Sequence, residues 1–555
     1  MGSGHILVYA FDVLMQIYTS VGYTEKEAAI SILENNLYGL DIDERAFQLA
    51  YFAVMMKARQ YHKFILKKRV QCNIHPIVES NGINVEQLHY FGVQLDEFSK
   101  NAAVTQMQGL ITKMHDAKEY GSLITIDNYD WELLREFVEE FGTEEGNFSL
   151  FNTYEEETAN LIEAQSKLKE IIAVGEVLAQ KYEVVVTNPP YMGSNSMSVI
   201  LSEYAKKNYV NTKSDLFACF IEKGCDLATC HGFNCMVTMQ SWMFLSSFEN
   251  MRLELLSNYT INNLMHMENM VMGIAFGTAV TNLRKCKLGK FKGTYNLIKL
   301  CDIKENEPRE FPIKDNKFTQ VSSDNFNKIP GTPIAYWVSN AMYDVFKKGV
   351  NITNFIDTFQ GIITGDNNKF LRLWFELNCK KIAFNYENMS EINTNLKYWI
   401  PYNKGGEFRK WYGNQDYVVN WKNGPDDKTR GKKTFEAFYL KPYVSWSYIT
   451  SSTLATRFFP KGFLWDVHGS GIFDKNYNKL YYLQSFIGSK VGINLLQIVN
   501  HTISYQVENI AQLPIIISDT NDSKINDLTK ENIKQSKKDW DAFETSWDFK
   551  KHPLV

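Results

Sequence analysis

The sequence has few cysteines, no long apolar run and no excess of positive charge. Eight cysteines occur at irregular spacing among 555 residues. The closest group, Cys219, Cys225, Cys230 and Cys235, contains no Cys-x-x-Cys pair, so we expect buried free thiols and no metal site. No apolar stretch is long enough to cross a membrane and no secretory signal pattern is found. We therefore expect a cytoplasmic protein.

The formal net charge of -4 excludes a protein that attracts nucleic acid over its whole surface. One stretch, residues 404–461, is locally basic and also rich in aromatic residues. Such a stretch favours contacts with phosphates and bases, although a solvated face over an aromatic core explains single residues equally well. The candidate DNA-binding residues in this stretch are Lys404, Arg409, Lys410, Lys432 and Lys433.

At this length, more than one domain is expected. Residues 1–300 alternate strand-like and helix-like patterns, which predicts a doubly wound α/β domain. Helix-rich insertions are expected at 51–71 and 155–180, the second from the spacing of its apolar residues. We expect a connector at residues 301–333, a mixed α+β domain at 334–520 and a C-terminal helical segment at 521–555.

The tetrapeptide Asn188-Pro189-Pro190-Tyr191 directly follows the apolar run 183–187. This run predicts a buried parallel strand, which the two prolines end. Asn188 then lies at the carboxyl edge of a sheet, where open α/β folds bind ligands. The Asn188 amide oxygen and the Pro189 carbonyl are two acceptors, and Tyr191 adds an aromatic face, a combination that suits the amine of a flat ring. A plain turn remains the alternative.

Two further segments predict a nucleotide-like ligand. Gly2-Ser3-Gly4 precedes a helical pattern, and such a loop allows close approach to backbone N–H groups. Residues 37–43 form a short strand pattern that ends in Asp41 and Asp43. A carboxylate in that place holds ribose hydroxyls in nucleotide-binding folds, so we assign this role to Asp41. Asp43 is better interpreted as a helix cap.

Taken in chain order, Gly2-Ser3-Gly4, residues 39–43 and Asn188-Pro189-Pro190-Tyr191 resemble segments of S-adenosylmethionine-dependent adenine-N6 DNA methyltransferases. The likeness extends over nearly the whole chain and is strongest to the PglX methyltransferases of BREX phage-defence systems, which are related to type IIG restriction-modification enzymes. Further segments that carry it are Lys213-Ser214-Asp215-Leu216-Phe217, residues 232–238, Ala275-Phe276-Gly277-Thr278, Gly361-Ile362-Ile363-Thr364-Gly365-Asp366-Asn367, Ile503-Ser504-Tyr505-Gln506 and residues 543–549.

The resemblance implies a Rossmann-like methyltransferase domain followed by a DNA target-recognition domain, with double-stranded DNA and other defence-system subunits as partners. The target adenine would be flipped out of the duplex. Asn188 and Pro189 would accept hydrogen bonds from its amine, while Tyr191 and Phe276 would stack on the base. S-adenosylmethionine would bind at Gly2, Ser3 and Gly4, at Asp41, and at Asp116, for which a turn-forming role is an equal alternative.

The sequence departs from that family at both ends. The resemblance places the first residues inside the glycine motif, so we expect the sheet to lack its first strand, and the last residues stop short of the family's final segment. An inactive DNA-binding fragment, or a silent cassette for exchanging recognition domains, is therefore one alternative. A protein glutamine methyltransferase is another, because its substrate amide is also a planar NH₂ group.

Overall fold

The structure is a computed structural model that describes residues 1–142, 153–422, 433–449, 453–475, 479–500, 504–517 and 520–554. It divides into two compact units. Unit 1 comprises Met1–Trp242 and Asn250–Ser323, and unit 2 comprises Met243–Glu249 and Asp324–Val555. The boundary after Ser323 falls within the stretch that the sequence assigns to a connector, and the C-terminal segment belongs to unit 2.

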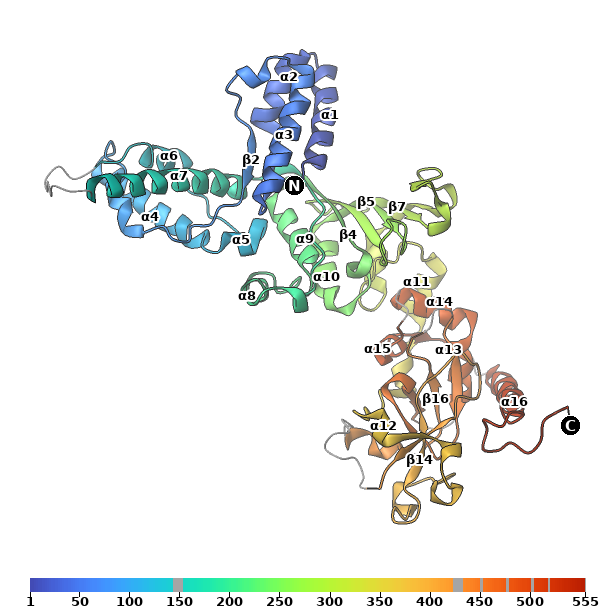
Figure 1. The fold of residues 1–555 in the computed structure, drawn as a ribbon. Coiled ribbons are helices and arrows are strands. Elements are labelled where there is room, and N and C mark those ends of the chain that lie inside the picture. Colours follow the sequence, from blue (N-terminus) through green and yellow to red (C-terminus); the bar gives the residue numbers. More distant parts are fainter. Residues whose placement is uncertain are drawn as a thin grey trace. The chain divides into compact units, whose positions relative to one another are not determined.

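Unit 1 begins with three helices that lie side by side (Figure 1). They are α1 (His5–Ser20), α2 (Glu25–Ser31) and α3 (Glu44–Tyr61). Phe11, Ile32 and Val54 are fully buried between them. Thr24 and Glu27 form a reciprocal capping box at the start of α2. Because α3 continues without a break to Tyr61, the helical pattern after residue 51 belongs to this group and is not a separate insertion.

A second helical group of unit 1 falls between residues 97 and 179 of the sequence. It contains α4 (Glu97–Lys113), α5 (Ala117–Tyr120), α6 (Trp131–Phe137) and the long helix α7 (Thr153–Ala179). As the apolar spacing predicts, α7 buries Leu161, Leu168 and Ile171 against α4 and α6. The remaining helices of unit 1 are α8 (Val199–Asn208), α9 (Leu216–Leu227) and α10 (Glu249–Asn258), whose first residue is assigned to unit 2.

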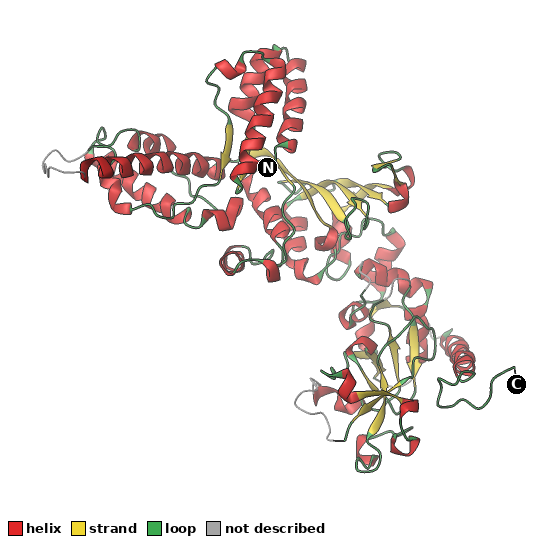
Figure 2. Ribbon diagram, viewed as in Figure 1, coloured by secondary structure: helices red, strands yellow, loops and turns green. Residues whose placement is uncertain are grey.

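The described strands of unit 1 form one six-stranded sheet and two separate pairs (Figure 2). The larger sheet has the order β10–β7–β5–β6–β4–β3. Its strands are β3 (Tyr182–Thr187), β4 (Ala228–Met239), β5 (Thr260–Met267), β6 (Thr278–Arg284), β7 (Lys292–Ile298) and β10 (Lys317–Ser322). Strands β3–β4 and β5–β7 pair in parallel, whereas the other three neighbours are antiparallel. Unit 1 is thus an α/β fold, as predicted.

The strands β1 (Tyr38–Asp41) and β2 (Asn73–Pro76) form a parallel pair of their own, and β8 (Ile303–Lys304) pairs with β9 (Glu307–Pro308). The β1–β2 pair lies next to the large sheet, because the rings of Tyr38 on β1 and Tyr182 on β3 are 5.2 Å apart. No ladder joins β1 to β3 among the described residues.

The prediction that β3 is buried is wrong. It is a parallel strand, but it pairs only with β4 in the part of the chain that the structure describes. Its other edge has no partner strand among the described residues, and Val184 and Val186 are 54% and 49% exposed. Two half-exposed valines on a parallel strand are unusual, since both faces of such sheets are normally covered.

Unit 2 is mixed, as predicted. Its sheets have the orders β12–β19–β16–β17 and β13–β15–β14–β18, beside the pair β11–β20. The strands are β11 (Val350–Asn351), β12 (Ile356–Phe359), β13 (Leu371–Leu373), β14 (Trp399–Asn403), β15 (Tyr417–Asn420), β16 (Tyr443–Trp446), β17 (Thr456–Phe459), β18 (Leu464–Trp465), β19 (Gly471–Asp474) and β20 (Pro514–Ile515).

The helices of unit 2 are α11 (Asn340–Lys348), α12 (Asn367–Phe370), α13 (Leu480–Gly488), α14 (Lys490–Val499), α15 (Val507–Ala511) and α16 (Asp522–Trp540). Trp446 and Leu483 lie in one core, and Tyr402 and Trp465 lie in a second, aromatic one. The C-terminal segment is joined to this unit, because α16 packs on α13 and Trp547 packs against Phe384 and Phe463. Within the described residues, no helix has the length and apolar character needed to span a membrane.

Candidate functional site

Asn188 follows the last residue of β3, at the carboxyl end of the strand, as predicted. The residue is exposed, whereas Pro189 is buried. The Tyr191 hydroxyl donates to the Asn188 amide oxygen at 3.2 Å and to the Val237 carbonyl on β4 at 3.3 Å. The turn therefore carries an open amide whose oxygen is engaged by a neighbouring hydroxyl.

Tyr191 lies between two other aromatic side chains. Its ring is 5.7 Å from the Phe276 ring at 73° and 6.1 Å from the Phe217 ring at 89°. Phe276 comes directly before Gly277 and β6, two strands away from β3 in the sheet. The structure thus brings together the two predicted stacking residues, although they are far apart in the sequence. Burial raises the pKa of Tyr191, so the hydroxyl stays protonated and is a donor at neutral pH.

The turn after Tyr191 is fixed by Asp215, the N-cap of α9. One Asp215 carboxylate oxygen accepts from the Met192 backbone N–H at 3.1 Å and from the Phe217 N–H at 3.3 Å. The Leu216 N–H donates to the Met192 carbonyl at 2.9 Å. In the sequence, the segment 213–217 contributes to the family resemblance, but no role is predicted for Asp215. The signal that could have identified Asp215 is an acidic residue placed before an apolar helix.

Asp41 and the Gly2 loop lie in contact, as the nucleotide-site prediction requires. The Asp41 Oδ2 atom accepts from the Gly2 N–H at 2.8 Å and from the Met1 amino group at 3.3 Å, while Oδ1 accepts from the Asp43 N–H at 3.0 Å. A carboxylate offers about four acceptor positions. One position on Oδ1 therefore remains for a hydroxyl donor.

The other residues of this loop have mostly local roles. Gly4 has a φ of 90°, and a Cβ atom there would lie 2.8 Å from the Cα of Ala50 on α3, so its glycine is required by packing. Ser3 is exposed, and its hydroxyl contacts the His5 ring at 3.0 Å. Asp43 accepts from the Arg45 N–H at 2.9 Å and caps α3, as predicted.

Asp116 has a left-handed backbone with a φ of 54° and pairs with Asn81, which follows β2. The Asn81 amide donates to Asp116 Oδ1, and the Asp116 N–H donates to the Asn81 amide oxygen, both at 2.8 Å. The hydrogen bond from Asn81 is the largest cause that lowers the pKa of Asp116. Both readings of Asp116 stay open, since it shapes a turn and also lies beyond the carboxyl end of β2. Asn81 was not singled out from the sequence.

The basic stretch of unit 2 is not one solvated face. Arg457 is fully buried and donates to the Arg409 carbonyl at 3.2 Å and to the Ser447 hydroxyl at 3.0 Å. Burial lowers its pKa to about 10. The Arg409 guanidinium lies 4.8 Å from the Trp540 ring and 3.7 Å from Asp539 on α16. Lys410 is exposed. Lys432 and the side chain of Lys433 lie outside the described residues.

Lys404 belongs to a cluster that sequence reasoning missed. Its ammonium lies 2.5 Å from the Asp466 carboxylate, which is 3% exposed. The two residues are 62 positions apart, and no sequence pattern links them. Among the described residues, no group of three or more His, Cys, Asp or Glu side chains could hold a metal ion.

Comparison with known proteins finds similarity to restriction-modification and adenine-specific methyltransferases. Residues 35–271 match the family of Eco57I restriction-modification methylases. The whole chain is 35% identical to an adenine-specific methyltransferase PglX of Lacticaseibacillus casei and 33% identical to an adenine-specific methyltransferase BrxX of Escherichia coli. It spans 46% of the length of each relative.

Among solved structures, the restriction-modification enzyme MmeI in complex with DNA matches 98% of this chain and 72% of its own, with a TM-score of 0.48 and 12% identity. The sequence comparisons confirm the resemblance on which the predictions rest: over its full length the chain is similar to the adenine-specific methyltransferases PglX and BrxX, and it spans about half the length of each.

Proposed function

We propose that this chain is the catalytic and target-recognition part of an adenine-N6-specific, S-adenosylmethionine-dependent DNA methyltransferase of a bacterial phage-defence or restriction-modification system. One observation carries the proposal: an exposed amide, Asn188, lies at the end of a parallel strand beside two aromatic rings 5.7 Å apart. An acceptor next to stacking rings is what an exocyclic amine on a planar base requires.

The proposed chemistry rests on positioning. A flipped adenine stacks on Tyr191 and contacts Phe276, and its amine donates to the Asn188 amide oxygen and to the Pro189 carbonyl. These two hydrogen bonds draw both N–H bonds to one side and direct the nitrogen lone pair away from the protein. The amine nitrogen would then be placed to accept the methyl group that the cofactor supplies, and its surplus proton would leave to solvent. Because such orientation supplies much of the rate, no strong base is required.

The Tyr191 hydroxyl is part of this mechanism. It donates to the Asn188 oxygen that the adenine amine needs, at 3.2 Å. Its second acceptor, the Val237 carbonyl at 3.3 Å, can hold the hydroxyl when the amine arrives. Before the base binds, this contact keeps the Asn188 amide oriented. When the amine binds, the Tyr191 hydroxyl can donate to the Val237 carbonyl instead.

The residues near Asp41 fit the cofactor in part. When bound, S-adenosylmethionine supplies a methyl group that is activated by its sulfonium. Asp41 would hold a ribose hydroxyl through its remaining acceptor position, and Gly2, Ser3 and Gly4 would line the methionine part. Gly2 has space for this, because nothing lies within 4 Å of the Cβ position there. Asp116 would accept from the adenine amine of the cofactor.

We extend the proposal to the sheet of unit 1. The β1–β2 pair and the six-stranded sheet are two parts of one methyltransferase sheet, and a further strand between β1 and β3 would join them. The unpaired edge of β3 with its exposed valines, and the contact between Tyr38 and Tyr182, support this arrangement. None of the described residues supplies that strand.

Unit 2 would bind double-stranded DNA and select the target site, with Lys404, Arg409, Lys410, Lys432 and Lys433 as candidate phosphate contacts. Arg409 is the weakest of these, because it already contacts Trp540 and Asp539. Other subunits of the defence system are expected partners, and the bacterial cytoplasm is the expected location.

Calorimetric titration of S-adenosylmethionine tests the proposal, followed by methyl transfer to duplex DNA and to glutamine-containing peptides. The chain, its Asn188→Ala variant, and a version with a strand-forming segment joined ahead of Met1 are compared. Transfer to DNA adenine that is lost in Asn188→Ala supports the proposal. Binding only by the extended version supports an incomplete sheet and an inactive fragment. Transfer to peptides alone favours the glutamine methyltransferase, and no cofactor binding by either version refutes the enzymatic reading.

A further inference from the structure

The Asp466 carboxylate in unit 2 is surrounded by four donors. Its Oδ2 atom accepts from the Lys404 ammonium at 2.5 Å and from the Tyr402 hydroxyl at 2.9 Å. Its Oδ1 atom accepts from both the backbone N–H and the ring Nδ1 of His468, each at 2.9 Å. The Tyr402 hydroxyl has a second acceptor, the Ile362 carbonyl at 3.0 Å, so at least three of the four acceptor positions of Asp466 are filled at any time. Asp466 is thus held within the protein and is not the group that meets a ligand.

The two side chains that Asp466 holds reach the surface. The Asp466 side chain is 3% exposed, whereas those of Lys404 and His468 are 26% and 60% exposed. The His468 ring directs Nδ1 inward, so Nε2 lies on the opposite edge, and it has no hydrogen bond to another described residue. The Lys404 ammonium has three N–H groups, of which one lies toward Asp466 and one toward Asn367 at 3.4 Å. One N–H of the Lys404 ammonium therefore remains available, and His468 offers Nε2–H as a second donor in its imidazolium form.

The backbone segments that carry these side chains are locked together. The Asp466 N–H donates to the Asn403 carbonyl at 2.9 Å, and the Asn403 amide donates to the Gly469 carbonyl at 3.0 Å. Gly405 has a φ of 87°, and a Cβ atom there would lie 2.6 Å from the His468 carbonyl oxygen. Because the side chains are held before any ligand arrives, binding costs less conformational entropy than for free surface lysines.

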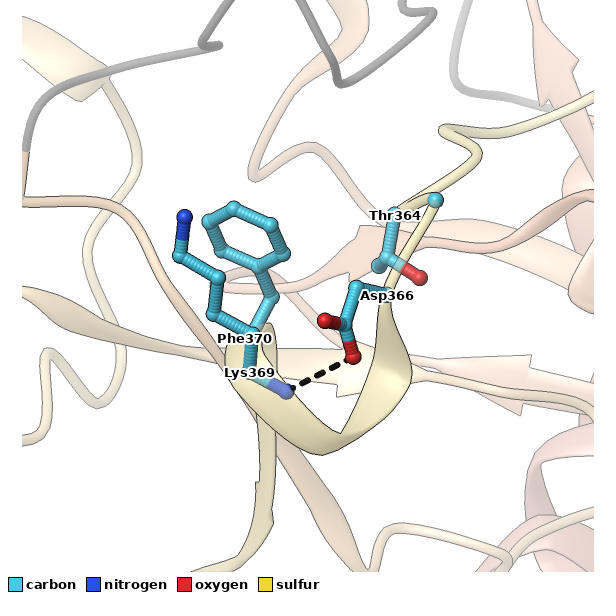
Figure 3. A pocket seen from close by; sticks show the side chains of 5 residues that line it. Thr364, Asp366, Lys369 and Phe370 are labelled. Carbon is cyan, nitrogen blue, oxygen red and sulfur yellow. Dashed lines mark hydrogen bonds between the residues drawn. The ribbon is translucent and has the colours of Figure 1, made fainter.

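A pocket lies beside Thr364, and Figure 3 shows the side chains that line it. It has a volume of about 280 Å³ and is lined by Thr364, Gly365, Asp366, Lys369 and Phe370. Asn367 joins the pocket to the cluster, because its amide oxygen accepts from the Thr364 hydroxyl at 2.5 Å and from Lys404. Lys369 adds a second cation, 4.8 Å from the Phe370 ring. The surroundings of Lys404 and His468 are thus hollowed and carry one further cation, Lys369, beside the Asp366 carboxylate.

We propose that Lys404 and His468, held by Asp466, form a binding site for a backbone phosphate of DNA. The proposal rests on DNA being the partner of unit 2. The fixed Lys404 ammonium and the imidazolium form of His468 suit the oxygens of one phosphate, and such contacts orient a protein on the duplex without reading its sequence. The buried carboxylate orients both donors, so Asp466 is a positioning residue that never touches the DNA.

Replacement of Asp466 separates this arrangement from general electrostatic attraction. Asp466→Asn removes one negative charge, so attraction by net charge alone predicts tighter DNA binding. The phosphate site predicts weaker binding, because an asparagine amide cannot accept from Lys404 and His468 together with Tyr402. We expect the affinity of the full chain for duplex DNA to fall at least 3-fold. Affinity that rises or stays unchanged in a folded variant would overturn the proposal.

The variants Lys404→Ala and His468→Gln test the site from its exposed side, and because each removes a partner of the buried Asp466 carboxylate, the folding of each variant is checked first. For Lys404→Ala we expect the slope of log K against log salt concentration to become shallower by about 1, the contribution of one phosphate contact. Lys461→Ala is the matched control, because Lys461 also lies 2.5 Å from a carboxylate, that of Glu387, but both side chains are about half exposed. We expect its slope to match that of the unchanged chain.

The outcomes distinguish this site from the proposed function. If Lys404→Ala and Lys461→Ala give equal slopes, the phosphate site is wrong, and the methyltransferase proposal is untouched. If the unchanged chain does not bind duplex DNA at all, both this site and DNA as the partner of unit 2 are wrong. The supporting result is that Lys404→Ala raises the KM for DNA in methyl transfer and leaves kcat unchanged.

Discussion

The candidate sites of the two units hold their functional side chains by different means. In unit 1, the ends of strands position the functional side chains, because Asn188 follows β3 and Phe276 precedes β6. The sheet brings the rings of Tyr191 and Phe276 to 5.7 Å from each other. In unit 2, buried polar side chains hold them: Asp466 fixes Lys404, and Arg457 donates to the Arg409 carbonyl. One site depends on sheet geometry and the other on a hydrogen-bond network.

The difference matches what each site is proposed to bind. Stacking on a planar base needs aromatic rings and uncharged acceptors. Residues at the ends of neighbouring strands provide both without a network of buried polar side chains. A phosphate needs cations at a fixed spacing, and long flexible lysines do not hold one geometry unless a partner restrains them. A buried carboxylate with four donors supplies that restraint.

The largest expected effect separates the two units most sharply. Asn188→Ala removes the proposed amine acceptor, so methyl transfer to DNA adenine should fall by at least about 100-fold. DNA binding should stay within about 2-fold, because the phosphate contacts lie in unit 2. Radiolabelled methyl transfer and fluorescence anisotropy measure the two properties on one sample. Equal losses of transfer and DNA binding would break the comparison.

The second largest effect concerns the network of unit 2. Arg457→Ala leaves the Arg409 carbonyl and the Ser447 hydroxyl without their buried donor, and it also opens a cavity. We expect the free energy of unfolding of unit 2 to fall by about 3 kcal/mol, measured by denaturant titration. Arg409→Ala is the control, since that guanidinium lies at the surface against Trp540, and it should cost about 1 kcal/mol. Similar losses for the two variants would contradict this role of Arg457.

A smaller effect is expected at Tyr191. Tyr191→Phe keeps the ring beside Phe276 and removes the hydroxyl that donates to Asn188. We expect kcat within about 3-fold of the unchanged chain, because the hydroxyl must leave the amide oxygen before adenine binds. Tyr191→Ala loses the stacking surface and should lower kcat/KM by about 10-fold or more. If the phenylalanine variant were as impaired as the alanine variant, the hydroxyl would be essential and the exchange mechanism wrong.

The smallest effect is a pH dependence at Asp215. Burial raises the pKa of Asp215 above 3.8 in the folded protein, so the charged form is disfavoured there. Its contribution to stability is present at pH below 3.8 and is lost as the pH rises through the raised pKa. Asp215→Asn keeps the capping oxygen and should therefore stabilise unit 1 slightly at neutral pH, by less than about 1 kcal/mol.

Denaturant titrations at neutral pH and below pH 3.8 measure this difference. The gain of the asparagine variant should disappear at the lower pH, where Asp215 itself is neutral. Asp215→Ala serves as the comparison, because it loses the acceptor for the Met192 N–H at either pH and should be destabilised at both. A gain that persists at low pH would mean that something other than charge is responsible.

Some of this organisation could be read from local sequence. The run 183–187 with its two following prolines predicts a strand that stops at Asn188, the apolar spacing of α7 predicts its buried face, and an aspartate before a helical pattern predicts the Asp43 cap. These features depend on neighbouring residues only. Local sequence could not show that β3 is half exposed, because exposure depends on which strands pair with its edges.

The sequence by itself determined the strand that stops before Asn188, the buried face of α7 and the family to which the motifs point. Only the tertiary structure decided which of its charges are available. Arg457 and Lys404 look alike in the basic stretch, yet one is fully buried and the other is held at the surface by Asp466. The physical reason is that a hydrogen-bond network forms between segments 62 positions apart, and no local pattern records such a pairing.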